Sequence, residues 1–181
     1  MYQELIMEEF FSPDDIRSFM GRCESDRQRI ILFLIYNYGF TVEEALEVKA
    51  GQFMRKPDYL LFNFTRKLTK KAHTYKIQFE NYRILYRVLI KLQDQDPILN
   101  RDKNLPITDA ILNKDLFDLA VIFNKKITPE LLFEGHLFWL FRKGVGFSQA
   151  VAEYGISLSG RPFKIWEAAM MAGKLWPFLL E

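Results

Sequence analysis

The stretch ITPELLFEGHLFWLFRKG, residues 127–144, has the boundaries of a helix and the composition of a core element. Thr128 can cap the helix, Pro129 suits its first position, and Gly144 can end it. Aromatic and aliphatic side chains fall on nearly every side, so the helix should pack on more than one face. His136 lies among them and is expected to be a hydrogen-bonded residue at the edge of the core. The sequence thus predicts a helix over residues 129–143.

Three further helices are expected before the middle of the chain. Ser12 and Pro13 supply the cap and the first position of one. The second, over residues 27–38, has so much apolar surface that it must be central. Thr41 and Glu44 then form a capping box that opens a short third helix.

The residue composition changes after these helices. Residues 58–64 and 72–79 are rich in aromatic and β-branched residues and flank the basic segment RKLTKK, residues 66–71. This pattern predicts a β-hairpin with a long basic tip. Helical periodicity returns over residues 82–93, and a polar loop follows over residues 94–110. Four helices are predicted after this loop, over residues 115–125, 129–143, 148–154 and 162–176. The fold class is therefore α+β, mainly helical, with the helices arranged around a small β-hairpin.

Composition sets limits on the class of protein. The 181 residues are enough for one domain with a substantial core, and 49% of them are hydrophobic. The net charge is only +2, so overall charge does not by itself indicate a nucleic-acid partner. Cys23 is the only cysteine, which rules out an intramolecular disulfide and fits a reducing cytoplasm. Two histidines cannot alone hold a metal, and no metal or other cofactor is expected. The longest apolar run, residues 30–36, is far shorter than the roughly 20 residues that a membrane helix needs.

The order of the elements, and the residues that start and end them, resemble the catalytic domain of the tyrosine recombinases, the phage integrase family. In that family the long apolar helix ends in Thr-Gly-x-Arg-x-x-Glu, which Gly39 and Glu44 match here. The family's Thr-Pro-His-x-x-Arg box is matched at Thr128–Pro129, and the Gly-Val pair that follows it is matched at Gly144–Val145. The resemblance covers about residues 12–170 and implies the fold of that domain.

The family's hairpin carries a catalytic Lys near its tip, and Arg66 and Lys67 lie in that neighbourhood here. The other positions that carry chemistry in the family hold other residues in this chain. The first catalytic Arg falls on Thr41. The His and the second Arg of the Thr-Pro box fall on Glu130 and Phe133. The nucleophilic Tyr falls on Ile165 or Trp166.

Strand exchange in this family requires a tyrosine nucleophile and cationic donors that stabilise charge on the transition state. The family's Leu-Gly-His motif falls on residues 154–156, and no tyrosine follows Tyr154. Losing one preorganised donor typically costs ~10²-fold or more in rate, so the resemblance implies a protein that is not an enzyme. Catalysis relocated to Tyr154 would need His136, Arg142 or the hairpin lysines to converge on it, and the spacing does not indicate this.

Contact with double-stranded DNA is predicted for the basic residues of the hairpin. Five cations on a protruding turn can track phosphates, and the resemblance places the family's hairpin against the duplex. Further cations lie at the end of the 129–143 helix and at the start of the last helix. Each group also has a structural alternative: a solvated loop, a favourable interaction with a helix dipole, or a cover for apolar surface. The predicted DNA-binding residues are Arg66, Lys67, Lys70, Lys71, His73, Arg142, Lys143, Arg161 and Lys164.

Residues 1–11 are expected to be a lead-in or linker, and residues 12–181 a recombinase-like domain. The family's N-terminal core-binding domain is missing from this sequence, so the chain is expected to be a fragment or a shortened relative. The apolar tail, residues 167–180, should either pack onto a neighbouring subunit and give a homo-oligomer, or fold back on its own chain.

Two functions remain open. One is a non-catalytic DNA-binding protein that acts as a repressor-like regulator or architectural factor of a phage or other mobile element. The other is a protein-interaction module that regulates an active recombinase or another partner, which the modest net charge fits.

Overall fold

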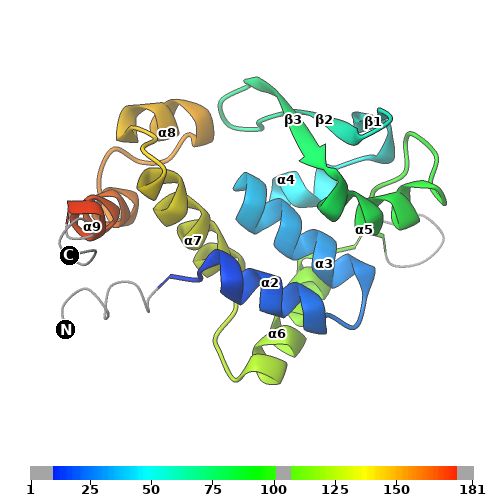
Figure 1. The fold of residues 1–181 in the computed structure, drawn as a ribbon, viewed down its shortest axis with the longest axis horizontal. Helices are drawn as coiled ribbons and strands as arrows, with labels where there is room; N and C mark the ends of the chain where they lie inside the picture. The colour runs from blue at the N-terminus through cyan, green and yellow to red at the C-terminus, as the bar shows by residue number, and fades with distance from the viewer. Residues whose placement is uncertain (1–9, 101–106, 175–181) are drawn as a thin grey trace.

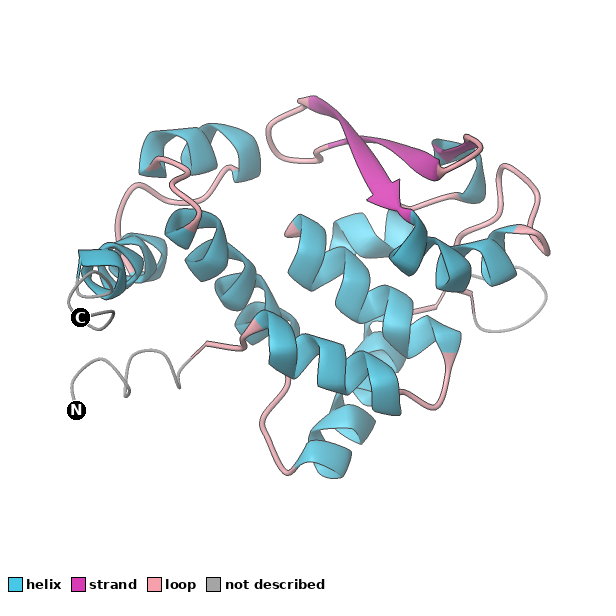
Figure 2. Ribbon diagram, in the orientation of Figure 1, coloured by secondary structure: helices cyan, strands magenta, loops and turns pink. Residues whose placement is uncertain are grey.

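A computed structural model describes residues 10–100 and 107–174, which form a mainly helical protein with one small sheet (Figures 1 and 2). The prediction of an α+β, mainly helical fold is confirmed. The elements are α2 (Pro13–Arg22), α3 (Asp26–Leu32), η1 (Phe33–Asn37), α4 (Val42–Glu47), η2 (Ala50–Gln52), β1 (Phe53–Arg55), β2 (Tyr59–Thr65), β3 (Ala72–Gln78), α5 (Phe79–Leu89), α6 (Asp109–Phe123), α7 (Pro129–Arg142), α8 (Phe147–Tyr154) and α9 (Arg161–Lys174).

The predicted capping residues start the helices where the sequence indicates. The Ser12 hydroxyl accepts a hydrogen bond from the backbone N–H of Asp15, whose carboxylate in turn accepts one from the Ser12 backbone N–H. Thr41 forms the corresponding capping box with Glu44 at the start of α4. The Thr128 hydroxyl accepts from the backbone N–H of Leu131 at the start of α7.

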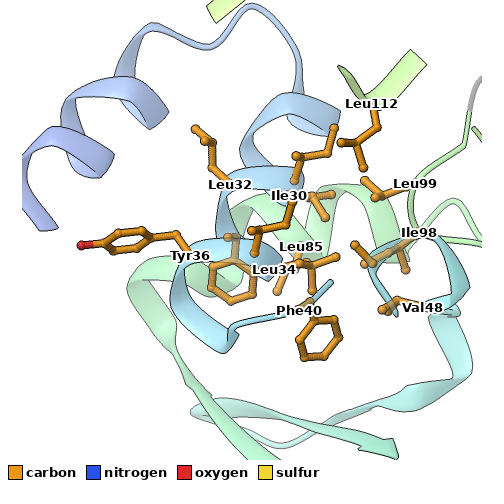
Figure 3. Packing of buried hydrophobic residues seen from close by; sticks show 14 of the residues in the cluster. Ile30, Leu32, Leu34, Tyr36, Phe40, Val48, Leu85, Ile98, Leu99 and Leu112 are labelled. Atoms are coloured by element: carbon orange, nitrogen blue, oxygen red, sulfur yellow. The ribbon is translucent and has the colours of Figure 1, made fainter. Parts of the chain in front are cut away.

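The core is centred on α3 and its continuation η1, as the sequence predicts for this segment. Figure 3 shows these side chains packed together with residues from the neighbouring helices and from the loop before residue 100. Ile31, Leu32, Leu34 and Ile35 are fully buried because other elements cover the helix on all sides. The last turns adopt a π-helical conformation, and Gly39 then ends the segment with a positive φ of 61°.

The sheet is antiparallel, with strand order β1-β2-β3, and lies along one side of the helices (Figure 1). Leu60, Phe62 and Phe64 of β2 point into the core, whereas the residues between them are more exposed. The predicted hairpin is confirmed as β2 and β3. The sequence analysis missed β1, because three residues are too short to show an alternating pattern.

Two predicted boundaries differ from the structure. Helix α6 begins at Asp109 rather than at residue 115, and α5 begins at Phe79 directly after β3. The segment predicted as a polar loop, residues 94–110, buries Ile98 and Leu99 in the core, so these two apolar residues anchor its described part. Composition favoured a loop because polar residues outnumber this short apolar pair.

A second apolar cluster joins α7, α8 and α9. Phe138 and Phe141 of α7 pack with Ile165 and Ala169 of α9, and all four are buried. For residues 161–174 the structure therefore has the helix folded back on its own chain. The rest of the predicted tail and residues 1–9 of the predicted lead-in lie outside the described residues, although Phe10 stacks on Phe138.

Candidate nucleic-acid interface at the β2–β3 hairpin

Arg66, the first residue after β2, lies inside the protein. Its side chain is 2% exposed and forms an ion pair with Glu44, with 2.9 Å between Nη1 and Oε2. Nη1 also donates to the carbonyl of Gly39 at 3.0 Å, and Nη2 donates to the carbonyl of Tyr38 and to the Tyr75 hydroxyl. The prediction that Arg66 offers its guanidinium to DNA from an exposed tip is wrong, because the internal acceptors and the burial remove it from the surface.

The Arg66 guanidinium also lies between two aromatic rings. It is 4.7 Å from the ring centroid of Phe40 and 4.7 Å from that of Tyr154. These cation–π contacts connect the hairpin to the end of η1 on one side and to the end of α8 on the other. The root of the hairpin is therefore fixed to both.

Glu44 uses both carboxylate oxygens. Oε2 accepts from the backbone N–H of Thr41 as part of the capping box and from Arg66, while Oε1 accepts from the backbone N–H of Lys67. The same carboxylate thus caps α4 and holds the hairpin. A charge with this many donors tolerates burial, and Glu44 is only 4% exposed.

Lys67 points outward but is not free of partners. Its ammonium lies 3.0 Å from Glu43 and 2.9 Å from Glu47, two carboxylates on α4. The hydrogen bonds to Glu47 and Glu43 raise the pKa of Lys67, so the ammonium stays charged. The acidic side of α4 thus neutralises the cation that follows Arg66.

The tip of the hairpin rests against the C-terminal end of α8. The Thr69 hydroxyl donates to the carbonyl of Glu153 at 3.2 Å. His73 stacks on Tyr75, and its Nδ1 lies 3.8 Å from the Glu153 carboxylate. Lys70 and Lys71 are exposed, and the described part of the chain contains no ion-pair partner for either. Of the five predicted hairpin residues, these two therefore carry charges that no carboxylate in the described ranges neutralises.

Tyr154 and His136 meet beneath the hairpin. The Nδ1 of His136 is 2.7 Å from the carbonyl of Tyr36, which can only accept, so Nδ1 carries the proton and Nε2 accepts from the Tyr154 hydroxyl at 2.9 Å. Burial lowers the pKa of His136 to about 4, and burial raises the pKa of Tyr154. The prediction that His136 is a hydrogen-bonded residue at the edge of the core is confirmed.

The sequence analysis missed this convergence on Tyr154. His136 is 18 residues from Tyr154 along the chain, and Arg66 reaches the ring from a separate element. One local signal was present: Gly39, where an added Cβ would lie 2.6 Å from the His136 ring, leaves room for the histidine. The reason for a glycine at position 39 becomes clear only once His136 is known to lie beside it.

At the positions matched to the family's catalytic residues, most of the side chains in this chain cap a helix or pack against apolar neighbours. Thr41 caps α4, and Phe133 packs against the rings of His136 and Tyr154. Ile165 is 1% exposed within the apolar cluster of α7 and α9. Glu130 is exposed in the first turn of α7.

The remaining predicted DNA contacts lie on the part of the protein formed by α7 and α9. Arg142 is half-buried at the end of α7, and Lys143 is exposed directly after it. Arg161 donates two hydrogen bonds to Glu134, so this cation is also paired internally. Lys164 is exposed on α9. These four cations and the hairpin cations therefore belong to different elements (Figure 1).

In residues 10–100 and 107–174, no group of three or more His, Cys, Asp or Glu side chains is placed to hold a metal ion. Within those same ranges, none of the helices combines the length and the apolar composition needed to cross a membrane.

Comparison with known proteins gives the fold. No family model matches the sequence, and no curated protein matches it. Among solved structures, the XerH site-specific recombinase bound to its difH substrate superposes with a TM-score of 0.65 at 16% identity, covering 92% of this chain and 53% of that one. The XerA recombinase gives a TM-score of 0.65 at 17% identity, covering 90% and 62%. The Tn1549 transposon integrase in complex with circular intermediate DNA gives 0.60 at 13% identity, covering 90% and 63%.

The chain therefore has the fold of the catalytic domain of tyrosine recombinases and integrases. It spans between about half and somewhat under two thirds of the length of these chains.

Proposed function

We propose that this chain is a DNA-binding protein of recombinase fold that does not cut DNA. Its role would be that of a repressor-like regulator or an architectural factor of a phage or other mobile element. The fold supports the DNA-binding part, since the XerH recombinase and the Tn1549 integrase were solved with DNA. The residues at the hairpin and at the matched catalytic positions support the non-catalytic part.

The buried Arg66–Glu44 pair is the observation that carries the non-catalytic part. A cation contributes to phosphoryl transfer only if its donors can reach the oxygens on which charge develops. The terminal nitrogens of Arg66 already donate to Glu44, to two backbone carbonyls and to Tyr75. Of the two residues matched to the nucleophilic tyrosine, Ile165 is buried in an apolar cluster and Trp166 packs against that cluster, and neither has a nucleophilic atom.

Tyr154 is the residue to which catalysis could have moved, since His136 and Arg66 both contact it. Its environment favours a structural role instead. Burial raises the pKa of the phenol, whereas a nucleophile needs that pKa to be lowered. The Tyr154 hydroxyl donates to a neutral His136 that is itself held by the carbonyl of Tyr36. The side chains of Tyr154 and His136 and the carbonyl of Tyr36 thus form a packed network between η1, α7 and α8.

DNA binding is proposed to rest first on Lys70 and Lys71 at the exposed tip. Lys143 and Lys164 are exposed on the other part of the molecule and would add phosphate contacts there. Arg66 and Arg161 are expected to contribute little directly, because each already has a carboxylate partner. Lys67 and His73 lie near carboxylates, and Arg142 is half-buried. These three residues would contact phosphates only after local rearrangement.

Two measurements test this function. A gel-shift titration with duplex DNA at low salt should retain the chain on DNA, and binding should weaken steeply as salt is added. Incubation with a nicked suicide substrate of the duplex should give no covalent protein–DNA adduct on a denaturing gel. A covalent adduct that disappears in the Tyr154→Phe variant would overturn the non-catalytic assignment and identify Tyr154 as the nucleophile.

An exposed apolar face on α6 supports a second candidate function, that of a protein-interaction module. Phe117 and Val121 are each 65% exposed and lie one turn apart, with Ile122 beside them at 38%. A chain that serves only this function should fail to retain duplex DNA at low salt. Self-association through residues 167–180 is a further proposal. Sedimentation of the whole chain against a chain ending at residue 174 tests it, because that cut keeps the packed part of α9.

A further inference from the structure

Three consecutive sections of the hairpin differ in how their cations are neutralised. Arg66 is paired with a buried carboxylate, Lys67 with two exposed carboxylates, and Lys70 and Lys71 with none in the described ranges. The two exposed carboxylates, Glu43 and Glu47, lie on α4. An external phosphate can therefore reach Lys70 and Lys71 more easily than Lys67, and Lys67 more easily than Arg66.

The two kinds of ion pair respond differently to a competing anion. Separating the buried Arg66–Glu44 pair would leave two uncompensated charges in the interior, so DNA should not displace it. The pairs of Lys67 are different, because its side chain is 47% exposed and those of Glu43 and Glu47 are 69% and 57% exposed. Exposed pairs of this kind are weak and screened by salt, so a phosphate oxygen can replace a carboxylate oxygen at the ammonium.

We propose that Glu43 and Glu47 act as an internal competitor of DNA for Lys67, so that α4 limits how strongly the hairpin binds a duplex. This inference rests on the proposed DNA-binding function. In the free protein the two carboxylates hold the Lys67 ammonium. On DNA the ammonium moves to a phosphate, and the two carboxylates are left close to the polyanion, which opposes binding.

The hydrogen bonds around Lys67 indicate why only its side chain is exchanged. Its backbone N–H donates to Glu44 at 2.9 Å, and the tip beyond it is held by the bond from Thr69 to Glu153. The backbone of the hairpin therefore stays in place, and a long flexible side chain moves between two sets of anions. No opening of the fold is required.

The test is a charge-matched comparison of DNA binding by the whole chain. The Glu43→Gln/Glu47→Gln variant removes the competitor while keeping side chains of the same size. The control variant, Asp14→Asn/Glu24→Gln, makes the same change in net charge at exposed positions on and after α2, which lies away from the sheet in Figure 1. Thermal unfolding of each variant checks that it is folded.

We expect the Glu43→Gln/Glu47→Gln variant to bind duplex DNA more tightly than the control, with a salt slope steeper by about 0.9. This corresponds to an advantage about 3-fold larger at 50 mM than at 200 mM salt. Adding Lys67→Ala should remove the steeper salt slope and reduce the advantage, whereas Lys67→Ala alone should change wild-type binding little. Equal binding by the two charge-matched variants would overturn the competition while leaving the DNA-binding function intact. If no variant retains DNA at low salt, the proposed function has failed, and the inference fails with it.

Discussion

Arg66 and Glu44 form an ion pair of 2.9 Å in which both side chains are almost completely buried, at 2% and 5% exposed. The pair joins the root of the hairpin to the first turn of α4. Glu44 also completes the capping box of that helix, so one carboxylate satisfies a helix end and compensates a buried cation. Arg66 therefore stabilises the folded protein instead of offering a cation at the surface of the hairpin.

Breaking this pair from one side should be strongly destabilising. We expect Glu44→Gln or Arg66→Met to lower the free energy of unfolding by about 3–5 kcal/mol, because each leaves one buried charge or its acceptors without a partner. The measurement is urea unfolding followed by circular dichroism. The double variant should be less destabilised than the sum of the two single variants, since it leaves no uncompensated charge. Additive effects would contradict the coupling, and Lys67→Met provides the exposed neighbour as a control.

Stability should fall in mild acid because of His136. Burial lowers the pKa of His136 to about 4, from an ordinary value of 6.5, so the folded state binds fewer protons than the unfolded state between these values. Stability is then highest above pH 6.5 and decreases as the pH falls towards 4. The loss by pH 5 should be about 2 kcal/mol relative to pH 8. Urea midpoints measured between pH 8 and pH 5 test this, and His136→Gln should remove most of the slope in this range.

Two glycine substitutions should have opposite effects. Gly39 has a φ of 61°, and a Cβ there would lie 2.6 Å from the His136 ring and 2.8 Å from the Tyr154 ring. Gly39→Ala should therefore cost at least about 2 kcal/mol. Gly21 lies in α2, and an added Cβ there would meet no atom of another segment within 4 Å, so Gly21→Ala should stabilise by about 0.5–1 kcal/mol. Thermal unfolding of the two variants checks both, and equal midpoints would contradict the packing described around Gly39.

The exposed lysines of the hairpin tip should set part of the salt dependence of DNA binding. Lys70→Ala/Lys71→Ala should reduce the slope of log affinity against log salt by up to about 1.8, corresponding to two phosphate contacts. The matched control is Lys114→Ala/Lys126→Ala, which removes the same charge from exposed positions on and after α6. A slope unchanged in the first variant relative to the control would show that the tip does not lie on the phosphates.

Local signals in the sequence were sufficient for most of the fold. Ser12, Thr41 and Thr128 start helices because a cap needs only a side-chain oxygen and a backbone N–H three residues away. The hairpin was visible because its strands combine alternation with aromatic and β-branched residues. Strand β1 was not, and neither was the burial of Ile98 and Leu99, because a pair or triplet of residues carries no period.

The candidate site was predictable in composition but not in geometry. The sequence placed a cluster of cations in the hairpin, and Lys70 and Lys71 are exposed there as expected. It could not separate these two from Arg66, which differs in environment although it lies only four residues from Lys70. That difference comes from Glu44, which is 22 residues away along the chain and next to the guanidinium in space.

The amino-acid sequence by itself determined where α2, α4 and α7 begin and where the hairpin lies, because capping and periodicity act within a few residues. It also determined that the positions matched by the resemblance to the two catalytic Arg and the nucleophilic Tyr hold Thr41, Phe133, and Ile165 or Trp166. The tertiary structure alone decided which cations remain available to a ligand. Charge neutralisation requires two side chains to come within about 4 Å, and folding brings carboxylates from α4 and α7 to cations far away along the chain.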